Sequence, residues 1–252
     1  MRQLFYGFAL LASALVSQVG AAENSCQDIP ALKLQLDDLV ARCAGSNLCT
    51  SRGYAGSGVD GAISSCISAY GAANRGFCAQ GVTCDGQQFA ISRGYAGSMA
   101  STAINNCVSA YGDSNRGFCA QDVQGQNGYG FAKSRGYAGD DVSDAIVQCT
   151  AAYGASNRGF CAQSVEVTGG MHYSVSRGYA GRDPDGAIDE CASAYGASNF
   201  GFCAQDVTSP NGQAICKSRG YAGSSVNSAI DHCAVAYGEG NRGFCAQDVT
   251  CN

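Results

Sequence analysis

Apolar residues recur along the chain in a pattern that repeats five times. Within the first copy, the apolar residues at helical spacing are Ala62, Ile63, Cys66, Ala69 and Tyr70. The copies open on the motif SRGYAG, at Ser51, Ser92, Ser134, Ser176 and Ser218. A period of about 42 residues is typical of an array of one supersecondary unit, in which each unit buries its apolar face with its neighbours.

Each repeat contains the boundary signals of one helix. The expected N-caps, which are residue types that accept hydrogen bonds from helix amides, are Asp60, Ser101, Ser143, Asp185 and Asn227. The expected stop signals are Gly71, Gly112, Gly154, Gly196 and Gly238. These boundaries predict a helix of about ten residues in each unit, short enough to depend on tertiary packing.

The segments around the helix predict two strands per unit. The motif GFCAQ after the helix is interpreted as a strand, and a second strand leads into SRGYAG, whose glycines allow a tight turn from strand to helix. Between units lie dipeptides that favour two-residue hairpins, namely Asp85-Gly86, Asn127-Gly128, Gly169-Gly170 and Asn211-Gly212.

Two cysteine positions occur only in the first and last units. Cys49 and Cys84 hold the same places in the first unit as Cys216 and Cys251 in the fifth, and the three middle units lack both. Two positions that gain and lose cysteine together indicate the disulfides Cys49–Cys84 and Cys216–Cys251. Each bond would join the start of one strand to the end of the other, so the two strands are expected to be antiparallel.

A second cysteine pair, 12 residues apart, recurs in every unit. The predicted disulfides are Cys66–Cys78, Cys107–Cys119, Cys149–Cys161, Cys191–Cys203 and Cys233–Cys245. Closing a loop near that length stabilises a fold by roughly 3 kcal/mol in the chain-entropy model. Bonds between neighbouring units are the alternative.

These signals together predict an α+β repeat protein stapled by disulfides. We expect five β-α-β units to form an open, curved antiparallel sheet of up to ten strands, with the helices on one face. The units span residues 49–89, 90–131, 132–173, 174–215 and 216–252. A closed five-fold ring, fastened by Cys49–Cys251, is the alternative.

The N-terminal segment carries an export signal and one further helix. Residues 1–22 combine Arg2, an apolar stretch of 13 residues and small residues, which predicts a cleaved signal peptide and no transmembrane span. Residues 23–48 predict an amphipathic helix that caps the array or pairs two copies as a homodimer. A Cys26–Cys43 bond is the weakest pairing, because a helix between them holds the two cysteines too far apart.

Composition excludes several classes of function. Sixteen cysteines in an exported chain indicate an oxidising compartment. A net charge of −5 argues against nucleic acid as a partner. No zinc-type cysteine spacing and no hydrolase motif is present, so we expect no metal, no cofactor and no catalytic residue. Of the two histidines, His172 and His232, the second is expected to be an exposed helix residue.

Recurring arginine and aromatic residues are the candidates for a ligand surface. One arginine row lies in SRGYAG and comprises Arg52, Arg93, Arg135, Arg177 and Arg219. A second row comprises Arg75, Arg116, Arg158 and Arg242, and Phe200 takes its fourth place. Strand alternation would direct a phenylalanine row away from the helices, at Phe77, Phe118, Phe160, Phe202 and Phe244. Tyr54 and Tyr70 recur in the same way. Structural roles, with arginine bonded to carbonyls and tyrosine packed between units, are the alternative.

The sequence therefore predicts a secreted protein, periplasmic or extracellular, that binds or scaffolds without catalysis. The expected partner is a glycan such as a cell-wall polymer, or a protein. One alternative is an inhibitor or effector against a single protein, using the irregular linker 165–173 with its Met171 and His172. The other is a secreted hydrolase centred on a histidine.

Overall fold

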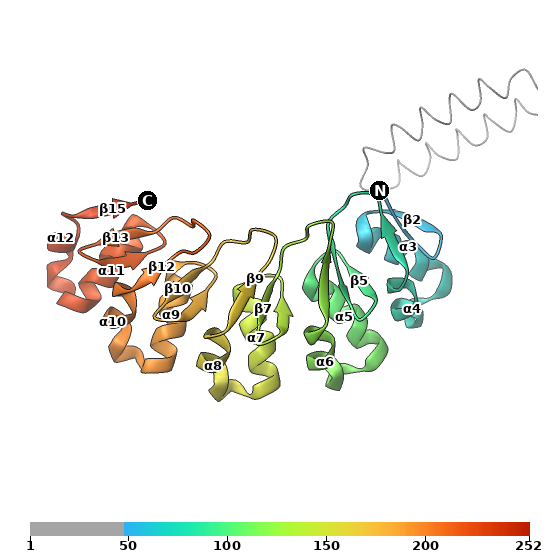
Figure 1. Cartoon of the computed structure of the whole chain (residues 1–252), viewed down its shortest axis with the longest axis horizontal. Helices are drawn as coiled ribbons and strands as arrows, with labels where there is room; N and C mark the ends of the chain where they lie inside the picture. The colour runs from blue at the N-terminus through green and yellow to red at the C-terminus, as the bar shows by residue number, and fades with distance from the viewer. Residues whose placement is uncertain (1–47) are drawn as a thin grey trace, which may run out of the picture. The chain divides into compact units, whose positions relative to one another are not determined.

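The computed structural model describes residues 48–252, in which five similar α+β units follow one another along the chain (Figure 1). The predicted α+β repeat is therefore confirmed. The predictions for the signal peptide, the capping helix, the Cys26–Cys43 bond and the N-terminal dimer contact lie outside the described residues.

Every unit contains three short strands. The first strands are β1 (Leu48–Ser51), β4 (Phe89–Ser92), β7 (Ala132–Ser134), β10 (Ser174–Ser176) and β13 (Cys216–Ser218). The second strands are β2 (Tyr54–Ser57), β5 (Tyr95–Gly97), β8 (Tyr137–Gly139), β11 (Tyr179–Gly181) and β14 (Tyr221–Gly223). The third strands are β3 (Val82–Cys84), β6 (Val123–Gln126), β9 (Val165–Val167), β12 (Val207–Thr208) and β15 (Val249–Cys251).

The first strand is the centre of each sheet. It pairs antiparallel with the second strand on one side and with the third on the other, as in the order β2-β1-β3. The motif SRGYAG is itself the hairpin between the first two strands, since Ser51 pairs with Tyr54. Arg52 and Gly53 form its two-residue turn with φ of 49° and 84°. The prediction that SRGYAG leads directly from strand to helix is therefore wrong.

The main helices are longer than predicted and begin earlier. They are α3 (Gly58–Tyr70), α5 (Ala100–Tyr111), α7 (Val142–Tyr153), α9 (Pro184–Tyr195) and α11 (Val226–Tyr237). The caps that bond a helix amide are Asp141, Asp183 and Ser225, each two residues before the predicted position. The predicted cap Asp60 instead accepts a hydrogen bond from the backbone amide of Ser98, in the next unit, at 3.3 Å. All five glycine stop signals are confirmed.

The α5 helix lacks a side-chain cap of its own, because its N-cap residue is Met99. Its first amide, on Ala100, donates to the Tyr129 hydroxyl at 3.0 Å. Burial raises the pKa of Tyr129 to about 12, so the phenol keeps its proton, which points to Asp140 Oδ1 at 3.3 Å. A residue of the following linker therefore caps this helix.

GFCAQ is mainly helical, which corrects the predicted strand. A single 3-10 turn, such as Ala72–Asn74 in the first unit, leads into each short helix. The short helices are α4 (Arg75–Ala79), α6 (Arg116–Gln121), α8 (Arg158–Ala162), α10 (Phe200–Gln205) and α12 (Arg242–Cys245). In α4 the neighbours Cys78 and Ala79 are both fully buried while Phe77 is 43% exposed. That burial pattern suits a helix and not the alternation of a strand.

The predicted continuous sheet is replaced by five separate three-stranded sheets. The turn dipeptides do bend the chain, as Asn127 and Gly128 show with φ of 53° and 84°. The strands on either side of each turn nevertheless join different sheets. The reason is that every first strand already has a partner on both edges within its own unit.

Seven disulfides occur within the described residues, at the pairs that the spacing predicts. Five join a main helix to the short helix of the same unit: Cys66–Cys78, Cys107–Cys119, Cys149–Cys161, Cys191–Cys203 and Cys233–Cys245. Cys49–Cys84 and Cys216–Cys251 cross-link directly paired strand residues. Because Cys49 and Cys251 have these partners, the Cys49–Cys251 link of a closed ring is not formed.

The core of each unit lies between the sheet and the main helix. Ile63, Ile104, Ile146 and Ile188 are at most 2% exposed, beside the buried cystines. The serine of each SRGYAG is fully buried and donates to a cysteine carbonyl of the short helix, as Ser92 does to Cys119 at 2.8 Å. No helix within residues 48–252 combines the length and apolar character needed to cross a membrane.

Candidate functional site

The most regular exposed surface of the described residues is a row of aromatic side chains, which we call the aromatic row. It consists of the last tyrosine of each main helix (Tyr70, Tyr111, Tyr153, Tyr195, Tyr237) and the phenylalanine of each short helix (Phe77, Phe118, Phe160, Phe202, Phe244). The tyrosines are 49–51% exposed and the phenylalanines 42–45%. Tyrosine and phenylalanine of one unit meet edge to face, with centroids 5.3–5.7 Å apart.

The phenylalanines lie on helices, so the prediction that they line a sheet face away from the helices is wrong. Their exposure has a different origin. The glycine that ends the main helix has φ near 90° and turns the chain into the short helix, and a side chain at Gly71 would meet nothing within 4 Å. Tyr70 and Phe77 therefore stand at an open corner of the unit.

The first arginine row lies over the phenylalanines of the aromatic row. The guanidinium carbon is 3.4–4.2 Å from the ring centroid in all five units. The Nε atom also donates to the phenylalanine carbonyl, at 2.8 Å for Arg93 and Phe118. These contacts explain why arginine occupies a turn position with φ near 46°, where a side chain costs about 1–2 kcal/mol.

Carboxylates offset part of the charge of this arginine row. Arg93, Arg177 and Arg219 lie 3.7, 3.8 and 3.0 Å from Asp122, Asp206 and Asp248, respectively. The equivalent residues beside Arg52 and Arg135 are Gly81 and Ser164, which carry no charge. Nearby carboxylates therefore balance the charge of three of the five arginines, although exposed ion pairs of this kind add little stability.

In the second arginine row, Arg75, Arg116 and Arg158 lie between units, and Arg242 pairs with Asp231 of its own unit. Arg75 Nε donates to Asn106 Oδ1 of the next unit at 2.8 Å, and Arg116 Nε donates to Gln148 Oε1 at 3.2 Å. Arg158 makes a bidentate ion pair with Glu190 at 3.0 and 2.5 Å. Asn106 and Glu190 are at most 6% exposed, so these arginines hold the array together.

The exception in this row has a matching exception in the next unit. Phe200 replaces the arginine, and the residue opposite is His232, with ring centroids 4.9 Å apart. His232 is 9% exposed and its Nδ1 lies 2.6 Å from the Ala222 carbonyl. The prediction that His232 is exposed is therefore wrong. At the junction between the fourth and fifth units, two positions change together: Phe200 stands where the preceding unit has Arg158, and His232 stands where the preceding unit has Glu190. This paired change was the sequence signal for the contact.

Two further contacts recur at the junctions between units. The glutamine at the end of the short helix donates to the tyrosine hydroxyl of the next unit, as Gln121, Gln163 and Gln205 do at 2.9–3.0 Å. A short-helix glycine also lies close to an alanine of the next main helix. An added Cβ at Gly159 would lie 3.0 Å from Ala194 Cβ. Each junction is thus a close contact between small residues, framed by polar bonds.

The Phe200 and His232 pair should be replaceable by arginine and glutamate, the residues that Arg158 and Glu190 provide at the preceding junction. We expect His232→Glu alone to lower the free energy of unfolding by about 2 kcal/mol, because a carboxylate is buried without a guanidinium. Adding Phe200→Arg should restore at least about 1 kcal/mol. Denaturant unfolding of the wild type, both single variants and the double variant measures this coupling. Additive losses would contradict the interpretation of the junction.

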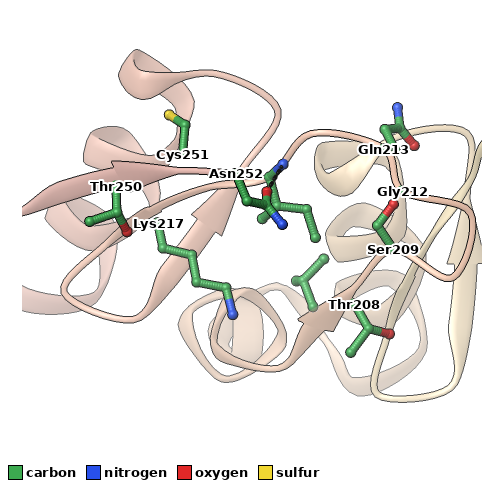
Figure 2. A pocket seen from close by; sticks show the side chains of 10 residues that line it. Thr208, Ser209, Gly212, Gln213, Lys217, Thr250, Cys251 and Asn252 are labelled. Atoms are coloured by element: carbon green, nitrogen blue, oxygen red, sulfur yellow. Dashed lines mark hydrogen bonds between the residues drawn. The ribbon is translucent and has the colours of Figure 1, made fainter.

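A separate cavity of about 470 Å³ lies where the fourth and fifth units meet (Figure 2). Lys217, Thr208, Thr250 and Asn252 are among its lining residues. In the other units, the position of Lys217 is held by Thr50, Ile91, Lys133 and Val175. Lysine therefore holds this position in two of the five units, whereas the tyrosine and phenylalanine of the aromatic row occur in all five.

The residues considered for a hydrolase or an inhibitor surface have structural contacts of their own. His172 Nδ1 is 2.6 Å from the Asn211 carbonyl, and Met171 packs against the core. Asp231 pairs with Arg242 of its own unit. Within the described part of the chain, no three His, Cys, Asp or Glu side chains gather where they could hold a metal ion.

No protein-family model matches the chain, and neither a curated protein nor a solved structure was found to match it.

Proposed function

We propose that this protein is an exported, non-catalytic binding module of the cell envelope or exterior, and that its ligand is a glycan polymer. The observation that carries the proposal is the aromatic row, with the same half-exposed tyrosine and phenylalanine in all five units. Export is supported by the seven disulfides, which persist in oxidising compartments, together with the predicted signal peptide.

The chemistry of the row suits sugar rings. A tyrosine ring offers an apolar face to the C–H groups of a sugar, and its hydroxyl can bond to a sugar hydroxyl. Beside it the arginine is already fixed by ring stacking and by its bond to a backbone carbonyl, so its free N–H groups are ordered before a ligand arrives. Side chains ordered in advance lose little conformational entropy on binding.

The charge of the protein favours a neutral or weakly charged glycan. The chain carries a net charge of −5, and carboxylates lie close to three of the five arginines of the row. A strongly anionic polymer would be repelled by these groups. Five equivalent sites in one chain would also bind a repeating polymer more tightly than a single sugar, since each later contact is intramolecular.

Removing tyrosines from the row tests this function. We expect Tyr111→Ala, Tyr153→Ala and Tyr195→Ala together to weaken binding to insoluble cell-wall polysaccharide about tenfold or more, because each aromatic contact contributes about 0.5–1.5 kcal/mol. Co-sedimentation with the polysaccharide measures the affinity.

The matched control is Val147→Ala with Val235→Ala, two side chains that are 48% and 54% exposed but lie outside the row. Far-ultraviolet circular dichroism should be the same for all variants. Equal binding by the tyrosine variant and the wild type would exclude the row as a glycan site.

A further inference from the structure

In each of the first four units, one face is covered by the next unit; the same face of the fifth unit is uncovered among residues 48–252. Ala79, Ala120, Ala162 and Ala204, at the ends of the short helices, are fully buried. Their counterpart Ala246 is exposed. An added Cβ at Gly201 would lie 3.1 Å from Ala236 Cβ, whereas one at Gly243 would meet nothing within 4 Å among the described residues.

Among residues 48–252, nothing covers the opposite face of the first unit. The second residue of its second strand, Ala55, is exposed, whereas Ala96, Ala138, Ala180 and Ala222 are at most 4% exposed. Tyr54 is only partly buried, while the tyrosines at its position in the other units are 7–8% exposed. These two faces have the residue types that bury one another at the four junctions.

We propose that the fifth unit of one molecule binds the first unit of a second copy, head to tail, in the geometry of an internal junction. In that geometry Gln247 would donate to the Tyr54 hydroxyl of the second copy, as Gln205 does to Tyr221 at 3.0 Å. Gly243 would lie against Ala69, as Gly76 lies against Ala110. The interface is thus one that this sequence already forms four times.

Arg242 is arranged for the same contact. Arg116 uses Nη1 to bond Asn105 of its own helix at 2.9 Å and uses Nε to bond Gln148 of the next unit. Arg242 uses Nη1 in the same way on Asp231, the counterpart of Asn105. In the proposed contact, Arg242 Nε would donate to the Ser65 hydroxyl of the second copy. Ser65 is the residue of the first unit at the position of Gln148.

The contact joins two different faces, so it does not close by two-fold symmetry. Repeated addition of copies would give open chains. This inference does not depend on the proposed glycan function, although a chain of copies would continue the aromatic row from one molecule to the next.

The test uses two variants of the mature full-length chain, each of which blocks one face. Ala246→Arg alters the fifth unit and Ala55→Arg alters the first, and both side chains are exposed, so neither change should disturb folding. By sedimentation velocity, we expect the wild-type weight-average mass to at least double between about 10 µM and about 1 mM, a range that suits a weak association. Each variant alone should remain monomeric.

An equimolar mixture of the two variants should form a dimer and nothing larger, because only one pair of intact faces remains. Ser193→Arg, at another exposed position, is the control and should assemble like the wild type. A wild type that stays monomeric at about 1 mM would overturn the proposal. So would an assembly that survives in both variants, which would place the contact elsewhere, for example in the N-terminal segment.

Discussion

Gly181→Ala is expected to lower the free energy of unfolding of the fourth unit by about 3 kcal/mol or more. An added Cβ would lie 2.6 Å from Ala187 Cα and closer still to the Ala187 amide nitrogen. These are backbone atoms in the first turn of α9, so no side chain can rotate away to relieve the clash. The strand and the helix would have to separate, which would open the core around Ile188.

Two other glycines of the same unit provide matched controls. Gly186→Ala places a Cβ 3.4 Å from Asp183 Oδ1, and Thr102, Asp144 and Ser228 occupy the same position in other units, so we expect a change near zero. Gly178→Ala meets no atom within 4 Å but has φ of 86°, so about 1 kcal/mol should be lost.

Denaturant unfolding with the disulfides intact gives the order of the three variants, and hydrogen exchange locates the loss in α9. Equal stability of the Gly181 and Gly186 variants would show that the strand and helix can separate at little cost.

Arg158→Ala is expected to lower the free energy of unfolding by about 3 kcal/mol at pH 7. This value is at the lower end of the range for breaking a buried ion pair, because the Arg158 side chain is 40% exposed. Burial raises the pKa of the Glu190 carboxyl above its ordinary value, and the hydrogen bond and charge of Arg158 lower it. Without Arg158 this pKa should rise further.

The stability lost in the Arg158→Ala variant should depend on pH, because the pKa of Glu190 is raised in the folded state. A carboxyl whose pKa is raised in the folded state stabilises the protein below its unfolded pKa and loses that contribution as pH rises through the folded value. The variant should therefore be closest to the wild type near pH 4 and furthest from it at pH 7. Unfolding curves at both values measure the difference.

Two comparisons separate the charge from the packing. Arg158→Ala combined with Glu190→Gln should recover most of the stability at pH 7, because no charge remains buried. Arg75→Ala removes the equivalent arginine from a neutral partner, Asn106, and should show a smaller loss with little pH dependence between 4 and 7. A loss for Arg158→Ala that is the same at pH 4 and pH 7 would contradict the ion-pair explanation.

The features that sequence could predict are those set by local residues. The period, the glycine stops and the cysteine spacings indicate the five units, the ends of the helices and the seven disulfides. The co-occurrence of Cys49 and Cys84 even indicates that β1 and β3 are antiparallel. Each of these signals needs only a short stretch of chain or a covalent constraint.

The errors concern segments whose conformation depends on the neighbouring unit. GFCAQ is too short for its apolar pattern to separate a strand from a helix, and its buried Ala79 is covered by the next unit. The turn at Arg52 could not be predicted from the sequence, because arginine is an uncommon residue at positive φ. The role of Arg158 required knowing that Glu190, 32 residues away, faces it across a junction.

Within the described residues, no disulfide crosses from one unit to the next, and the strand pairing that does so is a single bridge between Gln80 and Tyr95. A whole repeat could therefore be deleted or duplicated in the gene without leaving an unpaired strand or an unpaired thiol. The matching of residues across a junction, as between Arg158 and Glu190, restricts which repeats can become neighbours. Unequal recombination between copies thus offers this architecture a direct route to longer and shorter proteins.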